Sequence, residues 1–258
     1  MSHLYFLRLA YDGAAFHGWQ IQPIVRTVQG ELWRALKVLD PAAPMPQGTG
    51  RTDAGVHARA QGVLLEASRP WDPYRLLAAL NAHLPREARV MEVRDSPEGF
   101  YPRQHAIAKR YTYRISEGPS EDPFERRWRW HLHGVGTLDR PAMVEAAAHL
   151  VGEHDFSSFR HHDCVALTPV RHIYSVGMES NGALLDIVFE GNRFLMHQVR
   201  IMAGTLVDIG KGRLSPQAIP EILEAKDRRR AGQTAPPHGL CMEEVWYQPQ
   251  WGVGLVYS

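Results

Sequence analysis

The sequence reads GTGRTDAGVHA over residues 48–58, and this stretch decides how the segments on either side of it are joined. Its three glycines leave the backbone free to adopt positive φ angles and to approach another surface closely. The stretch has neither the period of a helix nor the alternation of a strand, so it predicts a shaped loop. Within it, the carboxylate of Asp53 and the guanidinium of Arg51 lie two residues apart. Either the loop is a surface turn with a solvated Asp53, or it presents Asp53 as a reactive group on a rigid scaffold.

The segments on both sides of this loop alternate between strand and helix patterns. Over the first hundred residues the order is strand, helix, strand, strand, helix, strand. Thr27 is a candidate N-cap for the first helix, and Asp72 followed by Pro73 is a strong start for the second. The expected strands are 4–10, 45–49, 61–67 and 89–94, and the expected helices are 28–39 and 73–83.

The same order recurs in the second half of the chain, with one extra helix. Its strongest signal is Asn181-Gly182, a two-residue turn that predicts a hairpin between two strands. The segment 117–137 fits the pattern poorly, and we interpret it as a connection that varies within a family. The expected strands are 105–116, 170–180, 183–190 and 240–247, and the expected helices are 139–152, 195–209 and 215–225.

Each half therefore fits the split β-α-β-β-α-β pattern of ferredoxin-like folds, in which helices cover one face of an antiparallel sheet. We predict an α+β protein of two pseudo-symmetric halves, residues 1–104 with the Asp53 loop and residues 105–258. In the first half the Asp53 loop joins the two middle strands. In the second half the tight Asn181-Gly182 turn is enough to join the equivalent strands. Such an insertion is better explained by function than by folding.

Composition limits the class of protein. A hydrophobic content of 44% in 258 residues is enough for a core. A net charge of +1 does not indicate nucleic-acid binding, so an RNA-binding protein of this kind must sort its charges into patches. Cys164 and Cys241 lack the spacing of a zinc site, and two cysteines suit a reducing cytosol. Residues 1–12 lack the apolar region of a signal peptide and no apolar run is long enough to span a membrane, so we expect a cytoplasmic protein.

The loop and six further blocks resemble, in the same order along the chain, the TruA-type tRNA pseudouridine synthases. Residues 51–58, RTDAGVHA, are similar to the active-site signature of that family. Seven ordered blocks that extend over nearly the whole chain make the resemblance specific. The other six blocks are residues 11–20, 109–113, 154–160, 168–171, 194–204 and 225–228.

This resemblance implies a fold and an activity. The fold is two ferredoxin-like domains that share a continuous sheet, with an active-site cleft between them. The activity is the conversion of uridine to pseudouridine at positions 38, 39 and 40 in the anticodon stem-loop of tRNA. The resemblance also implies a homodimer that needs no cofactor and no metal. A dimer is physically sensible because one pair of domains is small beside a tRNA.

The resemblance assigns the central chemical role to Asp53. Pseudouridine formation breaks the N1–C1′ bond, turns the uracil and rejoins it through C5. A carboxylate can attack the sugar or assist departure of the base, and the family's match places Asp53 there, beneath a flipped uridine. Burial raises the pKa of such a carboxyl group and a nearby cation lowers it. The family supplies this cation at the position of Arg200, which without the family is as well explained as a surface cation on an apolar helix.

Two further residues match family positions. Tyr111 matches the active-site tyrosine, whose ring can stack on uracil for about 1–3 kcal/mol per base and whose hydroxyl can relay a proton. Tyr113 shares its face of the strand, and tyrosine favours strands in any case, so the motif match alone selects Tyr111. Arg51 matches an arginine that is associated with occupying the space of the flipped nucleotide. Such a contact is useful because flipping costs a few kcal/mol.

Other cations near these residues have two explanations each. Arg103, Lys109, Arg110 and Arg114 occur within twelve residues that contain no acid. On one strand Arg103 and Lys109 would share a face and Arg110 and Arg114 the opposite face, so some of these charges are merely solvated. The cluster 228–230 is as well explained by a solvated helix end as by a tRNA contact.

Two other classes of function compete with the enzyme. An RNA-binding or chaperone module would keep the fold without turnover, and the set of Arg51, Asp53, Tyr111 and Arg200 argues against it. A metal hydrolase would use the histidines, acids and cysteine of residues 154–164, whose spacing matches no closed zinc pattern. Only the hydrolase predicts that a chelator abolishes activity.

Overall fold

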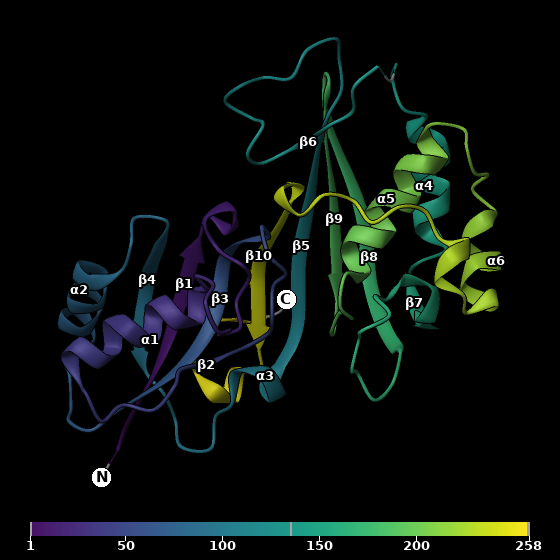
Figure 1. The fold of residues 1–258 in the computed structure, drawn as a ribbon. Helices are drawn as coiled ribbons and strands as arrows, with labels where there is room; N and C mark the ends of the chain where they lie inside the picture. The colour runs from purple at the N-terminus through teal and green to yellow at the C-terminus, as the bar shows by residue number, and fades with distance from the viewer. Residues whose placement is uncertain (1, 135, 257–258) are drawn as a thin grey trace. The chain divides into compact units, whose positions relative to one another are not determined.

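Strand β1 (His3–Tyr11) lies at the centre of the N-terminal strands in a computed structural model that describes residues 2–134 and 136–256 (Figure 1). It pairs antiparallel with β3 (His57–Ala67) on one side and with β4 (Ala88–Asp95) on the other. The short strand β2 (Gln47–Gly48) pairs with β3, which also neighbours β10 (Leu240–Tyr247). The strand order β4-β1-β3-β2 therefore places the loop between β2 and β3 at the end of a central strand.

Two helices with side-chain caps complete these elements, as predicted. Helix α1 (Val28–Leu39) begins after Thr27, whose hydroxyl accepts a hydrogen bond from the amide of Gly30 at 3.3 Å. Helix α2 (Pro73–His83) begins after Asp72, whose carboxylate accepts the amide of Arg75 at 3.0 Å. Both caps satisfy backbone donors that lack a partner within the helix. The predicted order of strand, helix, strand, strand, helix, strand is confirmed for these residues.

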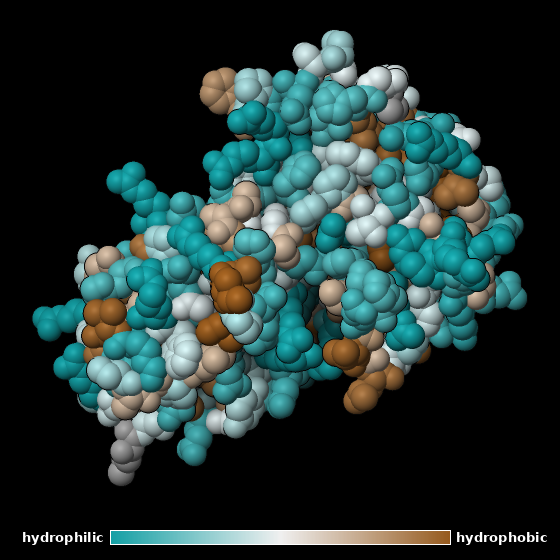
Figure 2. Space-filling view, viewed as in Figure 1, coloured by the Kyte–Doolittle hydropathy of each residue, from teal (hydrophilic) through white to brown (hydrophobic). Residues whose placement is uncertain are grey.

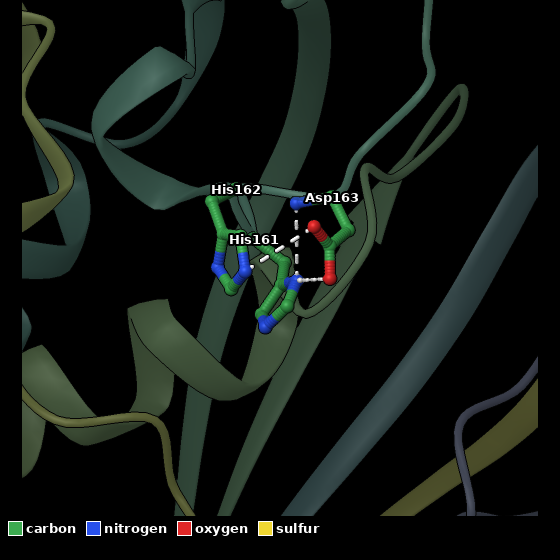
Figure 3. A group of neighbouring side chains, drawn as sticks. All are labelled: His161, His162 and Asp163. Atoms are coloured by element: carbon green, nitrogen blue, oxygen red, sulfur yellow. Dashed lines mark hydrogen bonds and ion pairs between the residues drawn. The ribbon is translucent and has the colours of Figure 1, made fainter.

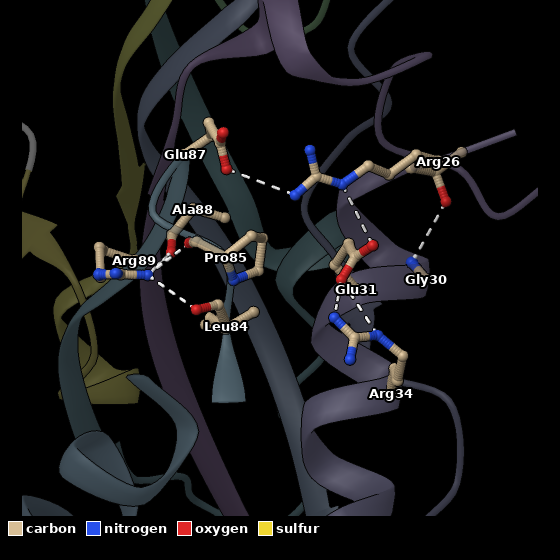
Figure 4. Close-up of polar contacts among 10 residues, drawn as sticks. Arg26, Gly30, Glu31, Arg34, Leu84, Pro85, Glu87, Ala88 and Arg89 are labelled. Atoms are coloured by element: carbon tan, nitrogen blue, oxygen red, sulfur yellow. Dashed lines mark hydrogen bonds and ion pairs between the residues drawn. The ribbon is translucent and has the colours of Figure 1, made fainter. Parts of the chain in front are cut away.

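Ion pairs fasten the segment that leads into α1 (Figure 4). Arg26 donates to Glu31 on α1 at 3.2 Å and to Glu87, just before β4, at 3.4 Å. Arg34, one turn further along α1, also binds Glu31. Arg89 donates through Nη1 to the carbonyls of residues 84, 85 and 88. Exposed pairs contribute little individually, but together they connect the start of α1 to the turn that precedes β4.

The chain forms two compact units. The first comprises the described residues up to Lys109 together with those from Met242 onward, and the second comprises the described residues of Arg110–Cys241. In the first unit the rings of Phe6, Phe100 and Tyr247 pack edge to face with centroids 5.2–5.9 Å apart. Such pairs are favourable beyond the area that they bury. Strand β10 therefore contributes directly to the core beneath the N-terminal strands.

The second unit contains strands β7 (Gly152–Asp155), β8 (Val170–Asn181) and β9 (Leu184–Gly191) and the part of β5 (Ala106–Ser116) from Arg110 onward, in the order β5-β9-β8-β7. The hairpin of β8 (Val170–Asn181) and β9 (Leu184–Gly191) turns at Gly182, which has a φ of +57°, as the sequence predicted. Strand β7 (Gly152–Asp155) pairs antiparallel with β8. Strand β5 (Ala106–Ser116) carries the tyrosines.

Three helices accompany these strands. They are α4 (Arg140–Ala148), α5 (Gln198–Gly210) and α6 (Ala218–Ala225). Helices α4 and α5 pack against each other in Figure 1. Helix α5 is buried along most of its length, and hydrophilic side chains cover much of the visible surface in Figure 2.

The structure corrects several details of the sequence prediction. The strands are not antiparallel throughout, because β6 (Trp130–His131) pairs parallel with β5 and β11 (Leu255–Val256) pairs parallel with β10. The predicted helix 139–152 ends at Ala148, since Gly152 has a φ of +109° and begins β7. The predicted strand 61–67 begins four residues earlier, at His57.

Residues 102–105 form the helical turn α3 (Pro102–His105), with Pro102 in its first position, where proline is favoured. Arg103 therefore lies on a helical turn, and the prediction that it shares a strand face with Lys109 is wrong. Within residues 2–134 and 136–256, no helix has both the length and the apolar character needed to cross a bilayer.

Candidate active site

The loop between β2 and β3 carries two of the predicted residues. Arg51 is exposed and Asp53 is half-buried. Gly55 has a φ of +80°, a conformation that favours glycine. The amide of Val56 donates to the carbonyl of Asp53 at 3.2 Å, which closes a tight turn around the carboxylate. The glycines of the motif therefore shape the turn that presents Asp53.

The segment that follows β1 holds this loop from one side. The hydroxyls of Tyr11 and Thr52 are 2.8 Å apart, and the amide of Trp19 donates to the carbonyl of Thr52 at 3.1 Å. Gly18 has a φ of +84°, and a Cβ atom there would lie 2.6 Å from the carbonyl oxygen of Thr52. A Cβ at Gly13 would lie 2.1 Å from the carbonyl oxygen of Val56. The two segments therefore touch backbone to backbone, which explains the glycines of residues 11–20.

His57 begins β3 and fixes the same two segments. Its ring is buried, and Nδ1 accepts the amide of Gly13 at 3.0 Å. A carboxylate oxygen of Asp12 also lies 3.2 Å from Nδ1 of His57. Sequence spacing relative to Asp53 gave no sign of this role, because it depends on a contact with a distant segment.

The other end of the loop rests on β3 and β10. The amide and hydroxyl of Thr49 both donate to the carbonyl of Gly62, at 2.9 and 3.0 Å. The side-chain amide of Gln61 donates to the carbonyl of Gly50 at 2.7 Å. The hydroxyl of Tyr247 on β10 is hydrogen-bonded to that of Thr49. Burial raises the pKa of the Tyr247 phenol well above its usual range, so it stays neutral.

The side chain of Arg51 contacts a different segment from the β3 and β10 residues that hold the start of the loop. Its Nε donates to the side chain of Gln20 at 3.1 Å, and the side chain is exposed. Gln20 belongs to the same segment that clamps Thr52. The guanidinium is therefore oriented by a neutral partner and keeps its charge at the surface.

Tyr111 and Tyr113 lie on β5 in different surroundings. Tyr111 is 7% exposed, and its ring packs edge to face on Phe194 with centroids 5.1 Å apart. Tyr113 is fully buried, and its hydroxyl donates to the carbonyl of Pro236 at 2.8 Å. Burial raises the pKa of the Tyr113 phenol well above its usual range, and the charge of Arg200 acts in the opposite direction. Arg200 is therefore close enough to Tyr113 for its charge to be felt there.

Arg200 lies in the first turn of α5 and is held by residues 232–236, which we call the strap. Its Nε donates to the carbonyl of Ala235 at 2.8 Å, and the amide of Ala235 returns a hydrogen bond to the carbonyl of Arg200 at 3.1 Å. The amide of Gly232 donates to the hydroxyl of Thr205 at 3.0 Å. A Cβ atom at Gly204 would lie 1.9 Å from the carbonyl oxygen of Gln233. Gly204 therefore lets the strap approach α5 and orient the guanidinium.

Replacing Gly204 with alanine should lower both stability and turnover. The added methyl group cannot be accommodated against backbone, and overpacking of this kind typically costs about 1–3 kcal/mol. Displacing the strap should also release Arg200. Gly177 is a control on exposed β8, where a Cβ meets nothing within 4 Å. Thermal unfolding and turnover of both alanine variants test this, and a Gly204→Ala protein with wild-type values of both would contradict it.

The predicted residues thus fall into two groups. Arg51 and Asp53 share one loop of the first unit, while Tyr111 and Arg200 belong to the second unit. The strap, His57 and the clamping segment had not been predicted. In the sequence, the signals near them were the glycines of blocks 11–20 and 194–204 and, for His57, its place in the motif of residues 51–58.

Most of the cations considered for RNA binding have structural partners. Arg110 donates to Glu190 at 2.6 Å, and Arg114 lies 3.7 Å from a carboxylate oxygen of Asp186. Arg228 donates to the hydroxyl of Thr234 in the strap at 2.9 Å. Hydrogen bonds from the neighbouring Arg229 lower the pKa of Asp227 to about 2. These arginines are therefore not all free surface cations. Arg228 in particular has a structural contact with the strap.

The histidine-rich segment is divided by the fold. His161, His162 and Asp163 lie together, with ligand atoms within 4.8 Å of one another (Figure 3). The amide of Asp163 donates to Nδ1 of His161 at 3.2 Å, and its carboxylate lies 3.2 Å from Nε2 of His162. His154 instead contacts the carbonyl of Val151, and Asp155 pairs with Lys226. The three grouped residues therefore contact one another in a surface turn through one backbone-to-side-chain hydrogen bond and close approaches of the Asp163 carboxylate to both histidines.

Comparisons with known proteins find the same kind of enzyme along most of the chain. A family model described as tRNA pseudouridine synthase matches residues 146–248. The tRNA pseudouridine synthase A of Myxococcus xanthus is 42% identical over 243 residues, covering 94% of this chain and 91% of the relative. That of Moorella thermoacetica is 44% identical over 249 residues, covering 93% and 98%. That of Geotalea daltonii is 39% identical over 241 residues, also covering 93% and 98%.

Proposed function

Because the chain belongs to the TruA family of tRNA pseudouridine synthases and is therefore an isomerase, we propose that it converts uridines 38, 39 and 40 of the tRNA anticodon stem-loop to pseudouridine. Asp53 is the proposed nucleophile. The observation that supports it is the fixation of its loop on both sides, by the 11–20 segment and by β3. A loop held in this way keeps a reacting group in place before substrate arrives.

In the proposed reaction a carboxylate oxygen of Asp53 forms a bond to C1′ of a flipped uridine. The N1–C1′ bond breaks, and its electron pair leaves with the uracil. The uracil turns, C5 bonds to C1′, and the carboxylate departs with its electron pair. The hydrogen on C5 is lost as a proton while N1 gains one, so the product is an isomer of the substrate.

The remaining roles come from the second half and from Arg51. Arg200 supplies the positive charge that keeps the Asp53 carboxylate ionised. Tyr111 stacks on the flipped uracil, and Arg51 fills the space that the nucleotide leaves. The repeated element order of residues 1–104 and 105–258 supports their description as two pseudo-symmetric halves. The family resemblance further supports a homodimer that works without a cofactor.

The test is chemical mapping of pseudouridine. An unmodified tRNA transcript with uridine at positions 38, 39 and 40 is incubated with the protein and then treated with carbodiimide. We expect reverse-transcription stops at those positions, and none in a transcript that carries cytidine there. Stops confined to other positions would contradict the proposed target, and no stops at all would favour an RNA-binding module.

Replacing Tyr111 separates stacking from proton transfer. Tyr111→Leu should lower turnover by roughly 10-fold to 100-fold, because one stacked base is worth about 1–3 kcal/mol. Tyr111→Phe keeps the ring and should lose only the part of the rate that depends on the hydroxyl. Tyr174→Leu on β8 is a control for loss of a partly exposed tyrosine in the same unit. If Tyr111→Leu turns over like wild type, neither role is correct.

A further inference from the structure

Lys109 places a buried positive charge at the base of the Asp53 loop. It lies on β5 with only 8% of the residue exposed, and its Nζ donates to the carbonyl of Thr49 at 3.3 Å. Thr49 is fully buried. Lysine is rarely buried, because removing an ammonium group from water is costly unless partners compensate it. The hydrogen bond to Thr49 is one contact that offsets this cost.

The charge acts on the part of the loop that leads to Asp53. Other carbonyls of the loop have neutral donors, since Gln61 donates to Gly50 and the amide of Trp19 donates to Thr52. Lys109 supplies a charged donor to Thr49, and charge-assisted hydrogen bonds are roughly twice as strong as neutral ones. Lys109 is also two residues before Tyr111 on the same strand, so both side chains extend to the same face.

We propose that Lys109 is a positioning residue for pseudouridine formation. Its ammonium anchors the Thr49 end of the loop and so holds the Asp53 carboxylate where it meets the sugar. Lys109 binds the loop backbone, so its effect reaches the reaction through Asp53. This inference rests on the proposed role of Asp53 as the nucleophile.

Gly50 offers a second way to test the same contact. A Cβ atom at Gly50 would lie 2.8 Å from the Nζ of Lys109, the flexible end of a long side chain. Gly50→Ala should therefore displace the ammonium without removing any charge and without a clash against backbone. The two substitutions disturb one contact in chemically different ways.

The experiment compares kcat and KM for tRNA in wild type, Lys109→Met, Lys109→Arg and Gly50→Ala, with thermal unfolding of each. We expect kcat to fall about 10-fold to 100-fold in Lys109→Met and Gly50→Ala, because small displacements of a reacting group have effects of that size. KM should stay within about twofold of wild type, since the contact lies beneath the loop. Lys109→Arg keeps the charge and a donor and should recover most of kcat.

Lys37→Met is the matched control. Lys37 lies in the same unit and also donates to a backbone carbonyl, that of Pro41, but at the end of α1. The Lys37→Met substitution removes the same charge from the protein and should leave kcat unchanged.

Wild-type kcat in both Lys109→Met and Gly50→Ala would overturn the proposal. A rise in KM with no change in kcat would also overturn it. If Lys109→Met does not fold, Gly50→Ala decides the question. A merely space-filling lysine would be replaced by methionine without loss of kcat. An active Asp53→Asn protein would instead refute the nucleophile, so failure of one assignment is distinguishable from failure of the other.

Discussion

Replacing Asp53 with asparagine should abolish pseudouridine formation in a protein that remains folded. The amide has nearly the same shape but cannot act as an anionic nucleophile at C1′. Loss of a nucleophile commonly lowers kcat by several orders of magnitude, so we expect a loss of roughly a thousandfold or more. Backbone groups of the loop and the hydroxyls of Thr49 and Thr52 make hydrogen bonds that asparagine at position 53 leaves in place, so the fold should survive.

Release of tritium from tRNA labelled at C5 of uridine measures this reaction directly, because the C5 hydrogen must leave. Asp72→Asn is the control, since asparagine is as good a helix cap as aspartate. It should keep wild-type turnover and the same unfolding temperature. Tritium release by Asp53→Asn at the wild-type rate would end the assignment of the nucleophile.

The second large effect is expected at Arg200. Arg200→Met should lower kcat by about 100-fold or more, because the role proposed for Arg200 is to supply the positive charge that favours the ionised form of the Asp53 carboxylate. The fold should lose the hydrogen bond to Ala235, worth about 1 kcal/mol. Arg200→Lys restores the charge but not the fork of donors, so its recovery should be partial.

Arg213→Met is the matched control for this change. Arg213 follows the same helix and pairs with Asp208 at 3.2 Å, with 64% of its side chain exposed. We expect its kcat to match wild type within about twofold, as for most surface substitutions. An Arg200→Met protein that is folded and fully active would remove Arg200 from the site.

The elements predicted well are those whose signals are local. Helix α1 has the predicted bounds, because Thr27 caps it and its apolar residues repeat with helical spacing. The β8–β9 hairpin follows from one dipeptide. Strand β7 is missed because its four residues, GEHD, are polar and carry no alternation. Helix α5 begins three residues later than predicted because His197, just before it, has a left-handed backbone with a φ of 61°.

The candidate site was predictable only in its chemistry-bearing residues. Asp53, Tyr111 and Arg200 stand in recognisable motifs, and the motifs say nothing of what holds each side chain. Ala235 of the strap contacts Arg200 from 35 residues away, and Lys109 is packed against a loop sixty residues earlier. Such contacts cannot be read from the alternation of apolar and polar residues along a strand. A buried lysine such as Lys109 looks like an exposed position in that pattern. Their trace in the sequence is glycine at the points of closest approach, Gly18, Gly50 and Gly204.

The backbone contact between residues 13–19 and 52–56 has a consequence for how substrate is admitted. Gly55 donates to Phe16, and Trp19 donates to Thr52, so these amides should exchange with deuterium only when the two segments separate. Many enzymes close a mobile lid over their substrate, and lids belong to the least stable parts of a protein. Here the proposed nucleophile stands on a loop whose backbone is held on both sides. If the anticodon arm is the substrate, as proposed, it has to bend and unstack to reach that loop, so stiffening the RNA, rather than the protein, should slow the reaction.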